Sequence, residues 1–180
     1  MFHSERDFSL LRTGFADTQA AEQSMEQRQR DVFESHRHRT FSLAFYMTGN
    51  ELEAEEILAQ TFIRAFQRSE RPNAAEVDAS LIVEFRERFS LEPELPCAST
   101  TAEHAVGRNV RRPELEAALL DLPPNERLLF LLRDVEGYPP ETIAALLGVP
   151  QPEVHRLLLS ARLRLCQKLA ALARSTAEAA

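Results

Sequence analysis

The sequence predicts an all-α protein: two small helical domains joined by a flexible linker, with a helix-turn-helix in the C-terminal domain. Three observations support this fold class. The 180 residues include 5 glycines and no tryptophan, while Leu, Ala, Glu and Arg, which lose little side-chain freedom in a helix, are frequent. Apolar residues recur at spacings of three and four, as one face of a helix requires. A stretch with prolines and Ser/Thr residues but no such period separates the two helical parts.

The N-terminal part is predicted to consist of a polar arm, residues 1–30, and a helical domain, residues 31–90. The arm is expected to be loose or to form a short helix. An apolar stretch then ends at Thr48-Gly49-Asn50, a helix-stop signal. Further helices are predicted from Leu52 to Gln67 and from Ala75 to Phe89, and three helices of this size can close a small bundle.

The C-terminal part begins with the expected flexible linker, residues 91–113. The helix-turn-helix domain is predicted over residues 114–173, and residues 174–180 form a tail. Prolines and glycines divide this domain into helices, because proline favours a helix start and glycine a helix end. The predicted helices are Leu115–Leu120, Glu126–Val135, Pro140–Leu147 and Pro152–Ala173.

The last two predicted helices meet the requirements of a helix-turn-helix. The first helix needs a small residue at the crossing, the turn needs a residue that tolerates a left-handed backbone, and the second helix needs an apolar anchor. Ala144, Gly148 and Val154 supply these in the right order. The alternative is an ordinary helical hairpin. A DNA reader is favoured because a basic tract without any acidic residue follows Val154, with Arg156, Arg162, Arg164, Lys168 and Arg174.

Charge and composition limit the possible partners and compartments. The formal net charge of −7 and the pI near 5.3 would repel a polyanion if the charge were spread evenly, so nucleic-acid binding must be local or assisted by a partner. Cys97 and Cys166 lie in no disulfide or zinc spacing. No signal peptide and no apolar run of membrane-spanning length is apparent, so we expect a cytoplasmic protein without membrane insertion.

An enzyme is not expected. The sequence has no Gly-rich phosphate loop, no nucleophile elbow and no metal-ligand spacing, so neither a catalytic residue, a cofactor nor a metal is predicted. His36 and His38 would point in different directions on a helix, which argues against a metal pair. Glu53, Glu55 and Glu56 crowd the first turns of a predicted helix, where the helix dipole favours carboxylates.

Two segments, EAEEILAQTFIRAFQR and LPPNERLLFLLRDVEGYPPETIAALLGVP, occur in an order that resembles bacterial sigma factors of the extracytoplasmic-function group. The resemblance covers most of Val32 to Lys168. It implies that the N-terminal domain binds core RNA polymerase and the minus-ten element of promoter DNA, while the C-terminal domain reads the minus-thirty-five element. An anti-sigma factor is a further implied partner.

By position, the resemblance assigns residues to both interfaces. The polymerase-binding residues are Glu53, Glu55, Glu56, Gln60 and Thr61. The DNA-binding residues on or near the reading helix are Gln151, Glu153, His155, Arg156 and Ser160, and the basic tract adds Arg162 and Arg164.

The sequence departs from this family in its DNA-binding parts. AAEVDASLIVEFRERF has no Trp, and Arg86 and Arg88 are its only cations, whereas stacking on bases needs exposed aromatics and a positive groove. The reading helix carries Glu153, His155 and Leu157 where family members often carry Lys and Arg. Either the promoter is unusual or DNA binding is weak. Two other functions stay open: a sigma-like protein that sequesters an anti-sigma factor or polymerase without reading a promoter, and a plain helix-turn-helix repressor.

Overall fold

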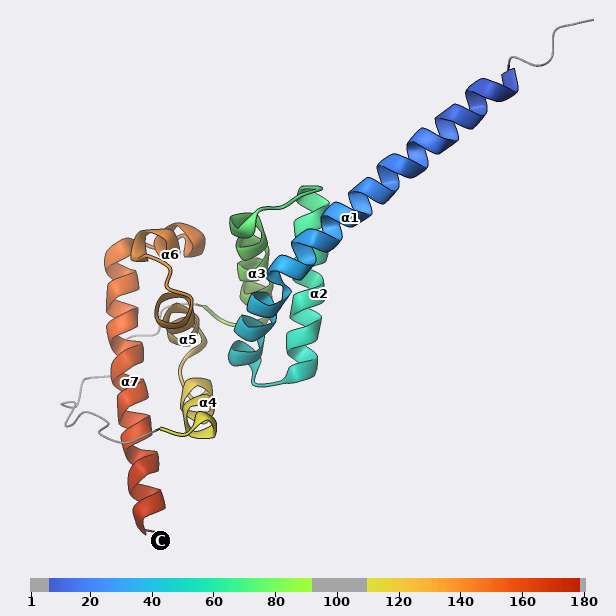
Figure 1. The fold of residues 1–180 in the computed structure, drawn as a ribbon. Helices are drawn as coiled ribbons and strands as arrows, with labels where there is room; N and C mark the ends of the chain where they lie inside the picture. Colours follow the sequence, from blue (N-terminus) through green and yellow to red (C-terminus); the bar gives the residue numbers. More distant parts are fainter. Residues whose placement is uncertain (1–6, 92–109, 179–180) are drawn as a thin grey trace, which may run out of the picture.

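The computed structural model describes residues 7–91 and 110–178, and every element it forms over these residues is helical (Figure 1). The expected all-α class is confirmed. In chain order the elements are α1 (Asp7–Thr48), α2 (Glu51–Arg68), α3 (Ala74–Arg88), α4 (Arg112–Leu120), α5 (Pro124–Phe130), the π-helical turn η1 (Leu131–Val135), α6 (Pro140–Leu147) and α7 (Gln151–Glu178).

Helix α1 is continuous over 42 residues, and its first half projects beyond the other helices (Figure 1). The predicted boundary between an arm, residues 1–30, and a helix beginning at residue 31 is therefore wrong. No proline precedes Pro72, and residues 7–30 are mostly good helix formers, so nothing in this segment ends the helix. The N-terminal half of the molecule, α1–α3, starts with this helix.

Short turns with polar caps join α1, α2 and α3. Gly49 has a φ of +68°, a left-handed conformation that glycine adopts without steric cost and that ends α1. The Asn50 side chain then accepts hydrogen bonds from the first N–H groups of α2. Asn73 and Glu76 form a capping box at the start of α3. The predicted second and third helices are confirmed to within one residue at each end.

The C-terminal half, α4–α7, follows the predicted order of helices. Helix α4 starts at Arg112, inside the stretch expected to be linker, with Pro113 in its first turn. The predicted helix Glu126–Val135 appears as α5 followed by η1, where the Glu136 N–H donates to the Leu131 carbonyl. Helix α6 has the predicted bounds, and α7 continues beyond Ala173. Most of the expected linker, residues 92–109, lies outside the described residues.

The two halves are in direct contact. Helix α3 packs against α6, and α1 packs against α4 and α5. One buried apolar cluster contains Leu43 and Phe85 from the N-terminal half together with Leu128 and Ile143 from the C-terminal half. Phe85 and Ile143 are completely buried. The two predicted helical domains therefore share part of their core.

Candidate functional site

The helix-turn-helix predicted from Ala144, Gly148 and Val154 is confirmed. Gly148 adopts a left-handed φ of +65° directly after α6, and its N–H donates to the Ala144 carbonyl. Val154 is fully buried, as the anchor of the second helix must be. The turn therefore holds the N-terminal end of α7 at a fixed angle against α6, with the first turns of α7 at the surface.

A stripe of exposed side chains follows α7 on the side away from the core. Gln151, His155, Leu159 and Arg162 are exposed and spaced by four, four and three residues, which places them on one helix face. We call these four residues the α7 stripe. Leu159 is 70% exposed, an unusual position for a large apolar side chain in the middle of a surface helix. Sequence reasoning missed Leu159, although its spacing from His155 was a usable signal.

Each described cation of the basic tract is paired with a carboxylate. The Arg156 guanidinium donates to both carboxylate oxygens of Glu153, and this hydrogen bond lowers the pKa of Glu153 below its usual value. Arg162 Nε lies 2.9 Å from Asp134 Oδ2, which raises the pKa of the Arg162 guanidinium. The remaining pairs are Arg164 with Glu126 at 3.3 Å and Lys168 with Asp121 at 2.8 Å.

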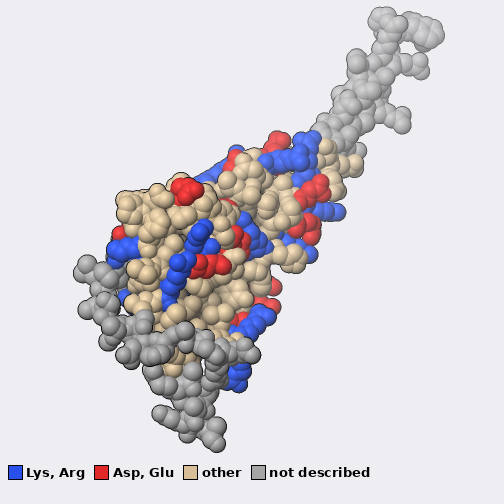
Figure 2. Space-filling view, turned by 60° about the vertical axis from the view of Figure 1, so that its left-hand side comes forward, with Lys and Arg blue, Asp and Glu red and all other residues tan. Residues whose placement is uncertain are grey.

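This pairing reduces the positive field of the basic tract. On the face shown in Figure 2, Lys and Arg side chains lie beside Asp and Glu side chains rather than forming one continuous blue surface among the described residues. The partners Asp134, Glu126 and Asp121 come from the segment between α4 and α6, not from α7 itself. Phosphate groups would have to compete with these carboxylates for the cations.

Two predicted DNA-binding residues are held at the interior of the C-terminal half. The Ser160 hydroxyl donates to Glu126 Oε1 at 2.8 Å, and Arg164 pairs with the other oxygen of the same carboxylate. Glu126 is 2% exposed, so both side chains are drawn toward the junction of α5 and α7. Leu157 stands where related sequences often carry a basic residue, and its side chain is buried in the core. Its replacement of a basic residue therefore leaves the α7 stripe unaffected.

The second predicted interface is the outer face of α2. Glu53, Glu55, Glu56 and Gln60 are exposed, as the predicted role requires. Thr61 is fully buried, so its assignment to a polymerase contact is wrong: it lies on the core side of the helix. The exposed side of α2 also carries two apolar residues that sequence reasoning missed, Leu52 at 76% and Ile63 at 50% exposure. We call Leu52, Glu53, Glu55, Glu56, Gln60 and Ile63 the α2 face.

Helix α3 offers little free positive charge. The Arg86 guanidinium donates to the Leu147 carbonyl at 2.6 Å, and Arg88 donates to Glu56 at 3.2 Å. The two aromatic residues of the segment do not form an open stacking surface, because Phe85 is fully buried and Phe89 is packed against the core. Among the described residues, the arginines and aromatic rings of this segment are therefore engaged within the fold.

A hollow beside the α2–α3 turn gathers two arginines, Arg28 and Arg71, that the sequence did not single out. Arg28, His36 and Arg71 line it, together with Asp31 and Asn73. Burial and the nearby charge of Arg39 lower the pKa of His36, so its ring is neutral at pH 7. Two guanidinium groups beside a neutral ring that can donate and accept hydrogen bonds can hold a phosphate and the edge of a base.

Neither metal nor membrane features were found in the described part of the chain. No group of three His, Cys, Asp or Glu side chains is arranged to hold a metal ion within residues 7–91 and 110–178. Across the same ranges, no helix has the length and apolar character needed to span a membrane.

A family model matches the segment that contains the helix-turn-helix. Residues 112–165, which run from the start of α4 into α7, match the model of sigma-70, region 4. The chain is also similar to the ECF RNA polymerase sigma factor SigE of Mycolicibacterium smegmatis, with 30% identity over 166 residues. That alignment covers 83% of this chain and 65% of the relative, so the chain spans slightly under two thirds of the relative's length.

The fold has a solved counterpart. It is similar to the sigma factor RpoE of Bartonella quintana, solved in complex with the anti-sigma factor NepR, with a TM-score of 0.58 and 20% identity. The match covers 82% of this chain and 97% of that one, and it supports the helical arrangement alone. The family match and the curated relative confirm the resemblance that the sequence indicates.

Proposed function

We propose that this chain, which is similar to extracytoplasmic-function sigma factors and carries a sigma-70 region 4 at residues 112–165, is a sigma factor. It binds core RNA polymerase and directs promoter-specific transcription initiation. Catalysis belongs to the polymerase, the chain itself is no enzyme, and it acts in the cytoplasm beside its partner. The observation that carries the proposal is the helix-turn-helix of α6 and α7 with its exposed α7 stripe, inside the matched region.

The C-terminal half reads the minus-thirty-five element through the α7 stripe. A helix of this kind enters the major groove with its N-terminal residues against base edges. Gln151 at the first turn can pair with an adenine, and His155 one turn later can reach a base or phosphate. Leu159 then contacts the C5-methyl group of a thymine, the apolar feature of the major groove. Arg162 reaches phosphate once it exchanges Asp134 for the DNA backbone.

The N-terminal half docks on core polymerase through the α2 face. Its exposed apolar side chains, Leu52 and Ile63, supply area that becomes buried in a complex. The surrounding carboxylates favour a partner surface with a cationic rim, because complementary charge sets orientation and association rate. Within the described residues Glu55 forms no ion pair, whereas Glu56 is engaged by Arg88. Glu55 is therefore the carboxylate most available to the partner.

The hollow lined by Arg28, His36 and Arg71 is the best-suited place for the minus-ten strand. Single-stranded DNA is held by positive grooves; Arg28 and Arg71 line this hollow, whereas Arg86 and Arg88 of α3 are engaged by the Leu147 carbonyl and by Glu56. An opened base and its phosphate fit this chemistry better than a stacked duplex does.

A sigma-like interaction protein is the second candidate function. The observation that favours it is the pairing of the α7 cations with carboxylates, which weakens DNA binding by this chain alone. The solved structure with a similar fold is of a sigma factor bound to an anti-sigma factor, and we infer a partner of that class for this chain under either function.

Core-polymerase binding tests the proposed function. Core enzyme is titrated into the labelled chain, and we expect saturable binding that the substitution Glu55→Lys weakens about tenfold, because it reverses a charge on the α2 face. Glu141→Lys, the same change at an exposed residue of α6, is the matched control. Absence of core binding by the unmodified chain would refute the proposal. Crosslinking to promoter DNA with core present separates the two candidates, since only a working sigma factor contacts both elements.

A further inference from the structure

A hollow at the C-terminal end of α1 gathers aromatic and charged side chains that the proposed function does not use. It lies where this end of α1 meets the start of α2 and the start of α4, which packs against α1 (Figure 1). The hollow has a volume of about 280 Å³, close to the lower end of the range for small-molecule sites. Its walls are formed by Phe41, Ser42, Phe45 and Tyr46 of α1, Glu51 of α2 and Arg112 of α4.

Three aromatic rings form one wall of this hollow. Phe41 and Phe45, one helical turn apart, have ring centroids 6.3 Å apart and an interplanar angle of 15°. The Tyr46 ring meets Phe45 edge to face at a centroid distance of 5.7 Å. All three rings are half-buried and packed against the core, so their positions are fixed while part of each ring stays exposed. Aromatic faces of this kind are surfaces on which a nucleic-acid base stacks.

One cation and one carboxylate lie beside these rings. The Arg112 Nε donates to Glu116 at 2.7 Å, and this hydrogen bond, with a smaller contribution from Tyr46, raises the pKa of the Arg112 guanidinium. The Arg112 side chain is 77% exposed, so its outer N–H groups can donate to a phosphate. Glu51 is exposed at the first position of α2 and forms no ion pair with another described residue. The exposed Ser42 hydroxyl adds a group that can donate or accept.

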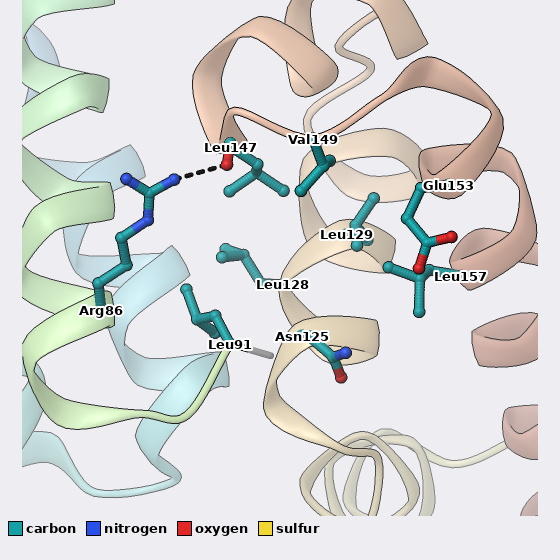
Figure 3. A pocket seen from close by; sticks show the side chains of 9 residues that line it. All are labelled: Arg86, Leu91, Asn125, Leu128, Leu129, Leu147, Val149, Glu153 and Leu157. Atoms are coloured by element: carbon teal, nitrogen blue, oxygen red, sulfur yellow. Dashed lines mark hydrogen bonds between the residues drawn. The ribbon is translucent and has the colours of Figure 1, made fainter. Parts of the chain in front are cut away.

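A second hollow, between α3 and the helix-turn-helix, lacks this combination of groups. Figure 3 shows that its walls are largely aliphatic, with Leu128 and Leu147 among them, and none of the labelled residues is aromatic. Its cation, Arg86, donates to the Leu147 carbonyl, and its carboxylate, Glu153, is engaged by Arg156. With a volume of about 60 Å³ it is also far smaller. A planar ligand that carries charge therefore fits the hollow at α1 and not the one in Figure 3.

We propose that the hollow at the C-terminal end of α1 binds a free guanine nucleotide, a small-molecule ligand beyond the proposed promoter and polymerase contacts. The base stacks on Phe41 and Phe45, and the phosphate accepts hydrogen bonds from Arg112. Glu51 reads the base, because its two oxygens match the two adjacent donors, N1–H and N2–H, on the Watson–Crick edge of guanine. Adenine presents an acceptor beside its amino group and leaves one carboxylate oxygen without a donor.

The charge in the hollow favours a single nucleotide over a nucleic-acid strand. Among the described residues that line it, Arg112 is the one cation, and Glu51 repels any further phosphate. A strand is held by a groove whose cations follow the backbone. One guanidinium beside an aromatic wall provides for one base and one phosphate group.

Isothermal titration calorimetry of the full-length chain with guanosine monophosphate (GMP) tests the site without polymerase or promoter. We expect saturable binding of GMP and at least about tenfold weaker binding of adenosine monophosphate (AMP), because adenine leaves a hydrogen bond of Glu51 unmade. Guanosine, which has no phosphate, should also bind about tenfold more weakly, because Arg112 then has no anion to pair with. Absence of GMP binding, or equal affinities for GMP and AMP, would overturn the proposal.

Two substitutions at exposed residues separate the roles of the charged groups. Glu51→Gln replaces one acceptor oxygen by an amide that faces a guanine N–H, so it should weaken GMP about tenfold and leave AMP unchanged. Arg112→Met should weaken GMP about tenfold and leave guanosine unchanged. The matched controls, Glu141→Gln in α6 and Arg68→Met in the last turn of α2, make the same changes at exposed residues outside the hollow. GMP affinities equal to those of the controls would overturn the assignment of the two residues.

A guanine within single-stranded DNA presents the same base and phosphate, so a further titration distinguishes the two sources. An oligothymidine with one internal guanine is titrated into the unmodified chain and into Arg112→Met. We expect no contribution of Arg112 to its affinity, because the strand needs cations that the hollow lacks. Binding at least about tenfold tighter than that of GMP, and lost in Arg112→Met, would overturn the choice of a free nucleotide in favour of a DNA strand.

Discussion

The substitution Glu153→Gln should strengthen DNA binding and make it more dependent on salt. In the structure the Arg156 guanidinium forms a bidentate pair with the Glu153 carboxylate: Nε donates to one carboxylate oxygen at 2.9 Å and Nη2 donates to the other. Since hydrogen bonding by Arg156 lowers the pKa of Glu153, the carboxylate is fully ionised at neutral pH and competes with phosphate. The amide in the variant has no charge and one acceptor oxygen, so Arg156 becomes available to the DNA backbone.

The size of the effect follows from one added phosphate contact. When the logarithm of the binding constant is plotted against the logarithm of the salt concentration, each phosphate contact adds about −0.9 to the slope. Between 50 and 200 mM salt, a variant with one more contact loses about 3.5-fold more affinity than the unmodified chain does. The pair itself is partly exposed, with Arg156 at 37% and Glu153 at 25%, so its loss should change folding stability by less than about 1 kcal/mol.

Fluorescence anisotropy with a labelled random-sequence 30-base-pair duplex checks this prediction at several salt concentrations. Random sequence isolates the phosphate term from base readout. Glu141→Gln, which also removes one negative charge but leaves Arg156 paired, is the control. Equal salt slopes for Glu153→Gln and Glu141→Gln would show that Arg156 is not released toward DNA, and the account of a neutralised basic tract would be refuted.

Three further outcomes are expected. Gly148→Ala should lower the free energy of unfolding in urea by about 1 kcal/mol, because Gly148 has a left-handed φ. Gly49→Ala should lower it by at least about 2 kcal/mol, because the new Cβ also meets the Leu120 side chain. Equal losses for the two variants would contradict this. Because folding lowers the pKa of His36, the unfolded chain binds a proton more readily than the folded chain does. The free energy of unfolding should therefore be highest above about pH 6.5 and decrease at lower pH. In the variant His36→Gln, the urea midpoint should change less between pH 7.5 and pH 5 than in the unmodified chain. Leu159→Ala should weaken a selected minus-thirty-five duplex about fivefold, and replacing its thymines by uracil should weaken the unmodified chain but not the variant; additive losses would exclude the methyl contact.

Local signals predicted the helix-turn-helix well. The small residue, the left-handed glycine and the apolar anchor at Ala144, Gly148 and Val154 act over ten residues, and the prolines that open α6 and α7 are visible in the sequence. The bounds of α6 were predicted to the residue for this reason. By contrast, the polar composition of residues 7–30 does not by itself indicate the long α1, because polar residues occur in loose arms and are also good helix formers.

The charge state of the reading helix could not be predicted from its own residues. The sequence shows a basic tract free of acids. Three of the carboxylates that pair with it, Asp121, Glu126 and Asp134, precede their partner cations by 28 or more positions and reach them only through the fold. The exposure of single residues was similarly hidden. Thr61 and Leu157 lie on the inner faces of their helices, which fixes them in the core and removes them from the interfaces.

The contact between the two halves could not be predicted from the sequence either. Tyr138 and Asp78 are 60 positions apart, and neither belongs to a periodic pattern that indicates a partner. The half-buried Tyr138 hydroxyl donates to the buried Asp78 carboxylate where little water competes, and Arg39 contacts both groups. This pair forms because α3 packs against α6, and that packing cannot be predicted from the two sequence segments alone.

Promoter-dependent transcription by core RNA polymerase measures whether this chain acts as a sigma factor. Core enzyme, the purified chain and a template library with randomised minus-thirty-five and minus-ten elements are combined, and the start sites of the transcripts are sequenced. We expect transcripts that begin at a fixed distance from selected elements only when the chain is present, and a changed minus-thirty-five preference with Leu159→Ala. Transcripts with no enriched element, although the chain binds core, would contradict it.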